Sequence, residues 1–141
     1  MIKKFASFVL LVTLFSCSTS KQPMLSQPMY DVLFGSDYGG ASFQFYEIVS
    51  DEKEFNILLT DEMIKPYVKK EDINTCNFIL VNMGEKKSGG YTLEVKKVEE
   101  LADKILVTLK EIEPKGFATM AVTKPCYVIK IKSKKPIEIV Q

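Results

Sequence analysis

Hydrophobic and polar residues alternate along much of the chain after residue 30, with the period of half-buried strands. The alternating runs fall at residues 32–34, 43–48, 91–97, 105–110, 127–132 and 137–139, with a weaker run at 117–122. The run at 78–83, "FILVNM", is apolar at both parities, which is typical of a central strand covered on both faces. The pattern in 43–48 slips by one residue, which predicts a β-bulge.

One segment has the period of a helix instead. Its apolar face is formed by Phe55, Leu58, Leu59 and Met63. Asp51 can cap the N-terminus, with Glu54 three residues later, and Lys65-Pro66 ends the pattern. Residues 67–77 have no clear period and are predicted to be a long connection. The fold class is therefore α+β and mostly β: a small antiparallel β-sheet or sandwich of about six or seven strands, with one amphipathic helix near residues 52–64.

The N-terminus has the layout of a secretory signal peptide. Two lysines in residues 1–4 precede an apolar stretch, Phe5–Phe15, that is too short to span a bilayer. "LFSC", at residues 14–17, resembles the bacterial lipobox, in which the cysteine after the cleavage site carries the lipid. The alternative is an ordinary cleaved signal with an incidental cysteine. We predict a lipoprotein signal peptide at 1–16, lipidation of Cys17 within a flexible tether at 17–29, and a single β-rich domain at 30–141.

This N-terminus predicts the location of the protein. We expect a membrane-anchored lipoprotein of the bacterial cell envelope. No acidic run that could direct export to the outer surface follows Cys17. We therefore expect the protein to face the periplasm.

Composition excludes several functions. The chain has no histidine, and all 19 basic residues are lysine. Without histidine, Ser-His-Asp and Cys-His nucleophile activation and imidazole-bound zinc are excluded. Without arginine, and with near-balanced charge, nothing indicates a nucleic-acid partner. Glu99 and Glu100 are adjacent, so on a strand they would point to opposite faces and cannot form a catalytic pair. We expect neither enzymatic activity nor a cofactor or metal.

Cys76 and Cys126 both lie at the start of a predicted strand. A disulfide between them is geometrically conceivable in an oxidising compartment. The alternative, which we favour, is two separately buried thiols that behave as small hydrophobic side chains.

The stretch "GEKKSGGYTLEV", at 84–95, is the first candidate for a functional site. It is not a phosphate loop, because its lysines precede the glycine pair and a strand follows. It predicts a hairpin that pairs 78–83 with 91–97, with Gly89 or Gly90 at positive φ. The candidate binding loop comprises Lys86, Lys87, Ser88, Gly89, Gly90 and Tyr91. Tyr91 either packs at the edge of the core or contacts a partner that the two lysines attract.

The residues around this loop resemble a known family. "MGEKKSGGYTLEVKKVEE" and "LVTLKEIEPKGFATMAVTKPCYVIKI" are similar to the C-terminal domain of the protease-complex accessory subunit family, the PrcB-type proteins. The resemblance covers about residues 32–140. It departs from the family at Cys126, which stands between Pro125 and Tyr127 where an aromatic residue commonly follows the proline directly. The family name implies a lipoprotein subunit of a cell-surface protease complex.

The resemblance leaves two hypotheses for function. The first is a non-enzymatic binding or accessory subunit, whose partner is a protein such as a secreted or surface protease. The second is a structural envelope lipoprotein with no protease connection. Lys115, Gly116 and Pro125 are secondary candidate loop residues, since their turns could cluster with 84–90 at one end of a sandwich. Alternatively, these segments are only turns.

Overall fold

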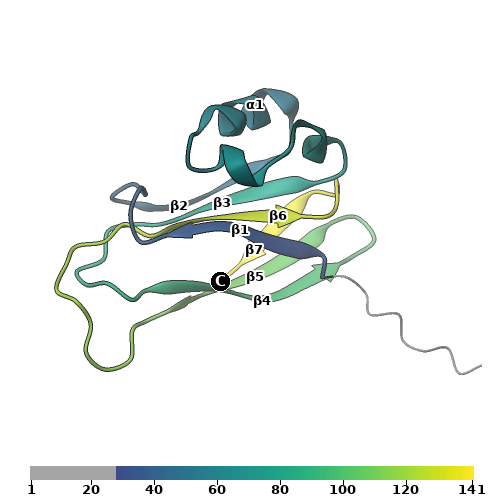
Figure 1. The fold of residues 1–141 in the computed structure, drawn as a ribbon. Coiled ribbons are helices and arrows are strands. Elements are labelled where there is room, and N and C mark those ends of the chain that lie inside the picture. The colour runs from purple at the N-terminus through teal and green to yellow at the C-terminus, as the bar shows by residue number, and fades with distance from the viewer. Residues whose placement is uncertain (1–27) are drawn as a thin grey trace, which may run out of the picture.

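The computed structural model describes residues 28–141, which form three stacked layers (Figure 1). The middle layer, the first sheet, has the strand order β1-β6-β3-β2. Its strands are β1 (Tyr30–Ser36), β2 (Gln44–Val49), β3 (Asn77–Met83) and β6 (Cys126–Ile131). All its neighbouring strands are antiparallel.

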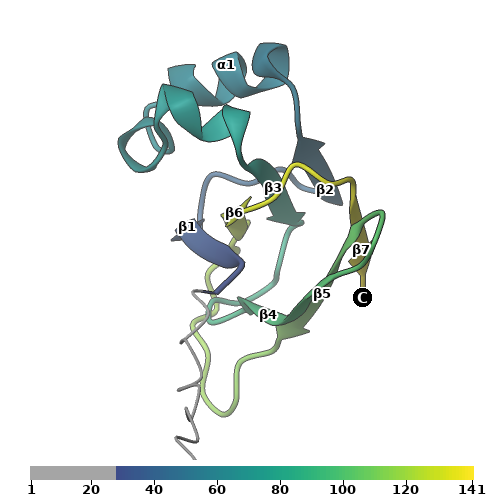
Figure 2. The same cartoon turned by 90° about the vertical axis from the view of Figure 1, so that its right-hand side faces the viewer.

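The outer layers cover the two faces of this sheet (Figure 2). On one face lies the second sheet, of order β4-β5-β7, formed by β4 (Thr92–Glu100), β5 (Ile105–Ile112) and β7 (Ile137–Val140). On the other lies a helical layer of α1 (Glu52–Thr60) and two 3₁₀ turns, η1 (Lys65–Tyr67) and η2 (Lys70–Asn74). The predicted β-rich sandwich with one helix is therefore confirmed. One pair departs from the antiparallel pattern: β7 crosses from the first sheet to the second and pairs in parallel with β5.

The first core lies between the two sheets. It is built from alternate residues of β3, β5 and β6, which are almost completely removed from solvent: Ile79, Val81, Met83, Ile105, Val107, Leu109, Ile129 and Ile131. The other parity of β3, beginning with Phe78, faces the helical layer. Because both of its faces are covered, β3 is apolar at nearly every position, as its sequence predicts.

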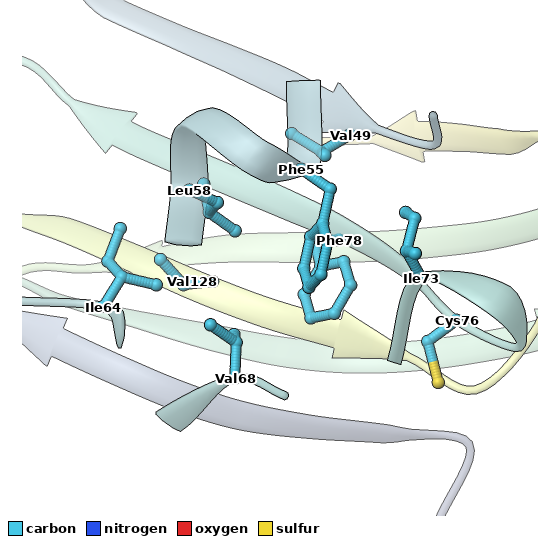
Figure 3. Close-up of a cluster of buried hydrophobic side chains, with 9 residues drawn as sticks. All are labelled: Val49, Phe55, Leu58, Ile64, Val68, Ile73, Cys76, Phe78 and Val128. Atoms are coloured by element: carbon cyan, nitrogen blue, oxygen red, sulfur yellow. The ribbon is translucent and has the colours of Figure 1, made fainter. Parts of the chain in front are cut away.

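The second core lies under the helical layer (Figure 3). Phe55 of α1 stacks on Phe78 of β3 with ring centroids 4.9 Å apart. The helix begins as predicted, since Asp51 accepts a hydrogen bond from the backbone N–H of Glu54 at 2.9 Å. It ends at Thr60, earlier than residue 64, because Asp61 accepts from the N–H of Met63 at 2.8 Å and opens a new turn. Met63 is consequently 46% exposed and does not extend the buried face of the helix.

Residues 67–77 contain more structure than their sequence suggests. They include η2, and they bury Val68 and Ile73 in the second core. Asp72 of η2 accepts a hydrogen bond from Lys130 Nζ of β6 at 2.7 Å, which ties the helical layer to the first sheet. The sequence shows no hydrophobic period for these residues, because 3₁₀ turns are too short to produce a repeating pattern.

The predicted hairpin between 78–83 and 91–97 is wrong. β3 pairs with β2 and β6, whereas β4 pairs with β5 in the other sheet. β3 is a central strand, and both of its edges are occupied by strands distant in sequence, β2 and β6. The predicted turn conformation is nevertheless confirmed at Gly90, where φ is +87°.

Two smaller strand predictions are also wrong. The bulge expected in 43–48 is absent, because β2 pairs with β3 in continuous register; the register shifts occur in β1, between Val32 and Phe34, and in β4, between Val95 and Lys97. Residues 117–122 form no strand and lie in the exposed β5–β6 loop, residues 113–125. Their apolar side chains lack a facing strand in the described part of the chain.

Cys76 and Cys126 are not bonded to each other. Cys76 immediately precedes Asn77, which pairs with Ile131, whereas Cys126 pairs with Asn82. Since β3 and β6 are antiparallel, the starts of these two strands lie at opposite ends of the ladder, about 17–20 Å apart at about 3.3 Å per residue. The two thiols are therefore separate, and Cys76 is buried whereas Cys126 is only partly buried.

The register of β1 shows at which end of the first sheet the chain enters the domain. Tyr30 pairs with Ile131, and Ser36 pairs with Cys126, which follows the β5–β6 loop directly. The chain therefore enters the described domain at the opposite end of the sheet from that loop, as Figure 1 shows. The predicted signal peptide, Cys17 and most of the predicted tether lie outside the described residues. No helix within residues 28–141 is long and apolar enough to cross a membrane.

Candidate functional site

Three segments meet at the end of the sandwich that is remote from the start of β1. They are the β1–β2 loop (37–43), the β3–β4 loop (84–91) and the β5–β6 loop (113–125), and we call this region the loop end. Lys86 and Thr123 exchange two backbone hydrogen bonds, of 2.8 and 3.0 Å. The carbonyl of Lys124 also accepts from the N–H of Gly40 at 3.0 Å. The predicted clustering of the turns thus occurs, with the β1–β2 loop as an additional member.

Lys86 is part of this framework rather than a free surface charge. Its ammonium group contacts both oxygens of Glu111 at 2.7 and 2.8 Å, and its side chain is only 16% exposed. The same ammonium lies 5.2 Å from the centre of the Tyr91 ring, a cation–π distance. Tyr91 itself is half-buried and packs against the core between the sheets. This arrangement couples the β3–β4 loop to β5.

The other residues of the predicted binding loop fall into two groups. Lys87 and Gly90 are exposed, whereas Ser88 is half-buried and its carbonyl accepts from Thr123 Oγ1 at 2.9 Å. Gly89 is buried, and a Cβ there would lie 2.4 Å from Thr119 Oγ1. Glycine at this position permits the close approach of the two loops. Of the two predicted lysines, only Lys87 presents an exposed side chain.

The secondary candidates also differ from one another. Lys115 and Gly116 are exposed at the tip of the β5–β6 loop, and a Cβ added at Gly116 would contact nothing within 4 Å. Pro125 is buried, and its carbonyl accepts from the N–H of Met83 at 2.9 Å. Pro125 therefore supports the loop end from beneath, while Lys115 and Gly116 are available at its surface.

The most exposed apolar side chains of the loop end were not identified from the sequence. Phe117 and Met120 are 111% and 95% exposed, and three further large side chains project nearby: Tyr38, Phe43 and Val122. Figure 1 shows the β5–β6 loop projecting beyond the sheets at this end. The signal was present in "GFATMAV", an apolar run whose alternation is too weak for a strand. Large apolar residues gathered at one exposed site are typical of an interaction surface.

A hollow of about 280 Å³ lies beneath the β5–β6 loop. Its walls include Tyr38, Gly89, Gly90, Pro114 and Phe117. Gly90 leaves its backbone exposed, while the aromatic rings provide apolar area. A surface of this kind suits contact with another protein chain, because apolar and small residues predominate in it, and Asp37 and Tyr38 are the two ionisable side chains among its described lining residues.

Two ionisable groups near the loop end, Cys126 and Tyr127, have raised pKa values. Burial, followed by the negative charge of Asp61, raises the pKa of the Cys126 thiol, which keeps it protonated and weakly nucleophilic at neutral pH. Burial likewise raises the pKa of Tyr127. Within residues 28–141, no three or more histidine, cysteine, aspartate or glutamate side chains are grouped so as to hold a metal ion.

Comparison with known proteins supports the resemblance seen in the sequence. Residues 77–132, from the start of β3 to just beyond β6, match the family model described as PrcB C-terminal. The matched segment includes all of the β3–β4 and β5–β6 loops. The PrcB-type resemblance is therefore confirmed over these residues.

One curated relative also matches. It is an uncharacterized protein of Methanocaldococcus jannaschii, 35% identical over 60 residues. The alignment covers 43% of this chain and 37% of the relative, so the chain spans little more than a third of that protein's length. No solved structure matches the chain.

Proposed function

We propose that this protein is a non-enzymatic lipoprotein of the bacterial cell envelope that acts as the accessory subunit of a protease complex and binds its partner through the loop end. The match of residues 77–132 to the PrcB C-terminal family supports a protease-associated accessory role. The proposed anchor is the lipid on Cys17, with the domain facing the periplasm. The partner is a secreted or surface protease.

The exposure of Phe117 and Met120 is the observation that carries this proposal. Leaving a large apolar side chain in water forgoes about 1.5–3 kcal/mol that its burial would contribute. Phenylalanine and methionine are enriched in protein interfaces, where such residues can supply most of the binding free energy. The fixed base of the β5–β6 loop reduces the entropy lost when the tip binds.

Lys87 and Lys115 add a positive charge component to this surface. Both are exposed and unshielded by burial, unlike Lys86. Charges at the rim of an interface mainly accelerate association and make it sensitive to salt. We therefore expect the partner surface to combine an apolar pocket for the loop tip with acidic residues around it.

The test is recovery of partners by the full chain from detergent-solubilised envelope. The wild type should recover a protease, and the variant Phe117→Ser/Met120→Ser should lose it without a change in thermal stability. Ile57→Ser is the matched control, because Ile57 is 68% exposed on α1, away from the loop end. If both variants recover the same proteins, the loop end is not the docking surface. If no protease is recovered by the wild type, the alternative of a structural envelope lipoprotein is favoured.

The anchor has a separate test. Cys17→Ala should leave the precursor unprocessed or release the protein from the membrane fraction, because the acceptor of the lipid is lost. The measurement is fractionation followed by intact mass. A variant that is cleaved at the same bond and remains membrane-bound would contradict the proposed lipidation.

A further inference from the structure

The first sheet has an uncovered region on its helical side, next to the loop end. The helical layer covers Phe78, but two residues further along β3 Leu80 is only partly buried. A cavity of about 150 Å³ opens here. Its floor is formed by side chains of three neighbouring strands: Phe34 of β1, Val128 of β6, and Leu80 of β3.

The cavity combines apolar walls with acidic side chains. Phe45 and Ile64 add further apolar wall, whereas the charged residues among its described lining are Glu47 and Asp61, both acidic. Glu47 lies in register with Leu80 and is exposed, so its carboxylate remains solvated at the rim. Among residues 28–141, no lysine lines the cavity, although lysines are abundant in the chain.

Asp61 is held in place at this cavity. One of its carboxylate oxygens accepts from the backbone N–H groups of Met63 and Ile64, at 2.8 and 3.3 Å. The negative charge of Asp61 contributes, after burial, to the raised pKa of Cys126, a wall residue. Its field therefore extends into the cavity, and the thiol acts as a neutral part of the wall.

We propose that this cavity accepts a lysine or arginine side chain from a protein partner. The alkyl stem lies on the apolar floor, and the cationic head is held between Glu47 and Asp61. The volume supports a single side chain, because pockets for drug-sized ligands are about 300–1,000 Å³. An uncharged apolar side chain gains no ion pair with either carboxylate, and an acidic one is repelled.

This inference rests on the proposed binding function, because the cavity adjoins the loop end through Gly39 and Cys126. The loop tip and the cavity would make opposite kinds of contact with the same partner. The loop tip inserts apolar side chains into the partner, and the cavity receives a basic side chain from it. Such reciprocal contacts fix the orientation of a complex more strongly than either contact alone.

The cavity can be tested without knowing the partner. n-Butylammonium reproduces the lysine side chain, and 1-butanol and butyrate are its neutral and acidic counterparts. Each is titrated into the ¹⁵N-labelled full chain in detergent at constant ionic strength, while amide chemical shifts are followed. We expect saturable shifts at Leu80, Val128 and Cys126 with n-butylammonium, weaker shifts with 1-butanol, and the weakest with butyrate.

The matched variants are Glu47→Gln and Glu138→Gln. Glu47→Gln should weaken n-butylammonium binding by about two- to fivefold, the usual effect of one partly exposed charge pair. Glu138→Gln should leave it unchanged, because Glu138 lies on β7 of the second sheet and pairs with Lys104, which immediately precedes β5. Equal shifts with n-butylammonium and 1-butanol that Glu47→Gln does not alter, or no saturable shifts at these amides, would overturn the inference.

Partner recovery separates this inference from the proposed function. If Phe117→Ser/Met120→Ser abolishes recovery but n-butylammonium does not bind, docking through the loop end is supported and the cavity inference fails. If n-butylammonium binds as expected but the loop variants recover the partner normally, the cavity binds a basic side chain and the proposed docking through the loop end is wrong. Glu47→Gln should lower recovery of the partner by about the same factor as it weakens n-butylammonium binding.

Discussion

The two faces of the first sheet are covered very differently. The face toward β4, β5 and β7 is covered along the whole of β3, where Ile79, Val81 and Met83 are 0%, 1% and 2% exposed. The face toward the helical layer is sealed at the end near Phe78, also 0% exposed, and open toward the loop end, where the 150 Å³ cavity lies. The same strands β3 and β6 contribute to both faces.

One face of the sheet thus serves mainly stability, whereas the other leaves a region open for recognition. A regular second sheet can follow the whole length of the first, because strands match strands in length and twist. A nine-residue helix spans only about 13–14 Å, at about 1.5 Å per residue, so it covers part of the sheet. The uncovered remainder is where a partner can contact the rigid sheet directly.

The largest effects should come from truncating each core in turn. Phe78→Ala removes the ring stacked on Phe55 and should cost about 3–5 kcal/mol of unfolding free energy, and Ile129→Ala should cost about 2–5 kcal/mol. Equilibrium unfolding in urea measures both. Hydrogen exchange should distinguish them, with faster exchange mainly in α1 for Phe78→Ala and mainly in β5 for Ile129→Ala. Identical exchange patterns would mean that the two faces form one cooperative unit.

An intermediate effect is expected at the turn into the second sheet. Gly90 has φ +87°, and a Cβ there would lie 3.0 Å from Pro114 Cβ. Gly90→Val should therefore lower the free energy of unfolding by about 1–2 kcal/mol or more.

Gly116→Val is the matched control for this turn. Its φ is also positive, at +86°, but it lies in open space on a loop that can adjust. Its loss of stability should be smaller. An equal loss in the two variants would show that backbone conformation alone, and not packing against Pro114, limits the residue at position 90.

A smaller effect should come from the ion pair that ties η2 to β6. Burial alone would raise the pKa of Asp72, but hydrogen bonds from Lys130 and the Lys69 backbone, together with the charge of Lys130, hold its pKa below the usual 3.8. Asp72→Asn should cost about 1 kcal/mol at neutral pH. Urea unfolding at pH 7 measures this difference.

The pH dependence of this ion pair has a definite sign. Because the folded-state pKa of Asp72 is depressed, its contribution is present above about 3.8 and is lost as pH falls through the lower, folded-state value. The stability difference between wild type and Asp72→Asn should therefore shrink below pH 3.8. A difference that stayed constant down to pH 2 would show that charge is not its cause.

The smallest effect on stability is expected at the loop tip. Phe117→Ser should change the free energy of unfolding by no more than about 0.5 kcal/mol, because the exposed ring loses no packing. Thermal unfolding of the full chain measures this. A loss above about 1 kcal/mol would mean that Phe117 packs on the loop end in solution and is not free to dock.

The sequence predicts the β-rich sandwich because alternation reports which faces of each strand are buried. It predicts the helix start at Asp51 because capping is a local interaction. It fails for the partner of β3, because alternation identifies a buried face but not the neighbouring strand. Strand pairing depends instead on contacts such as Asn77 with Ile131, between residues far apart in the chain.

The candidate site shows the same limit. The glycine pair and lysines of the β3–β4 loop are visible in the sequence, but the sequence does not show that Lys86 is taken up by Glu111. The sequence predicts a weak strand at 117–122, because apolar side chains give the same pattern whether they face a core or solvent. The sequence does not show the cavity, because Glu47 and Asp61 belong to different segments and line one cavity only in the folded chain.

The opposite placement of the chain's entrance and the β5–β6 loop has a mechanical consequence. The backbone enters at Tyr30, and the β5–β6 loop leads into Cys126, at the other end of the β1–β6 ladder. A pull between these two points moves β1 and β6 past each other along their length. Antiparallel hydrogen bonds lie perpendicular to the strands, so such a load is shared by the whole ladder and does not open it one bond at a time. A force exerted by a partner bound at the loop end would therefore load the β1–β6 pair in shear, the direction in which a strand pair is strongest.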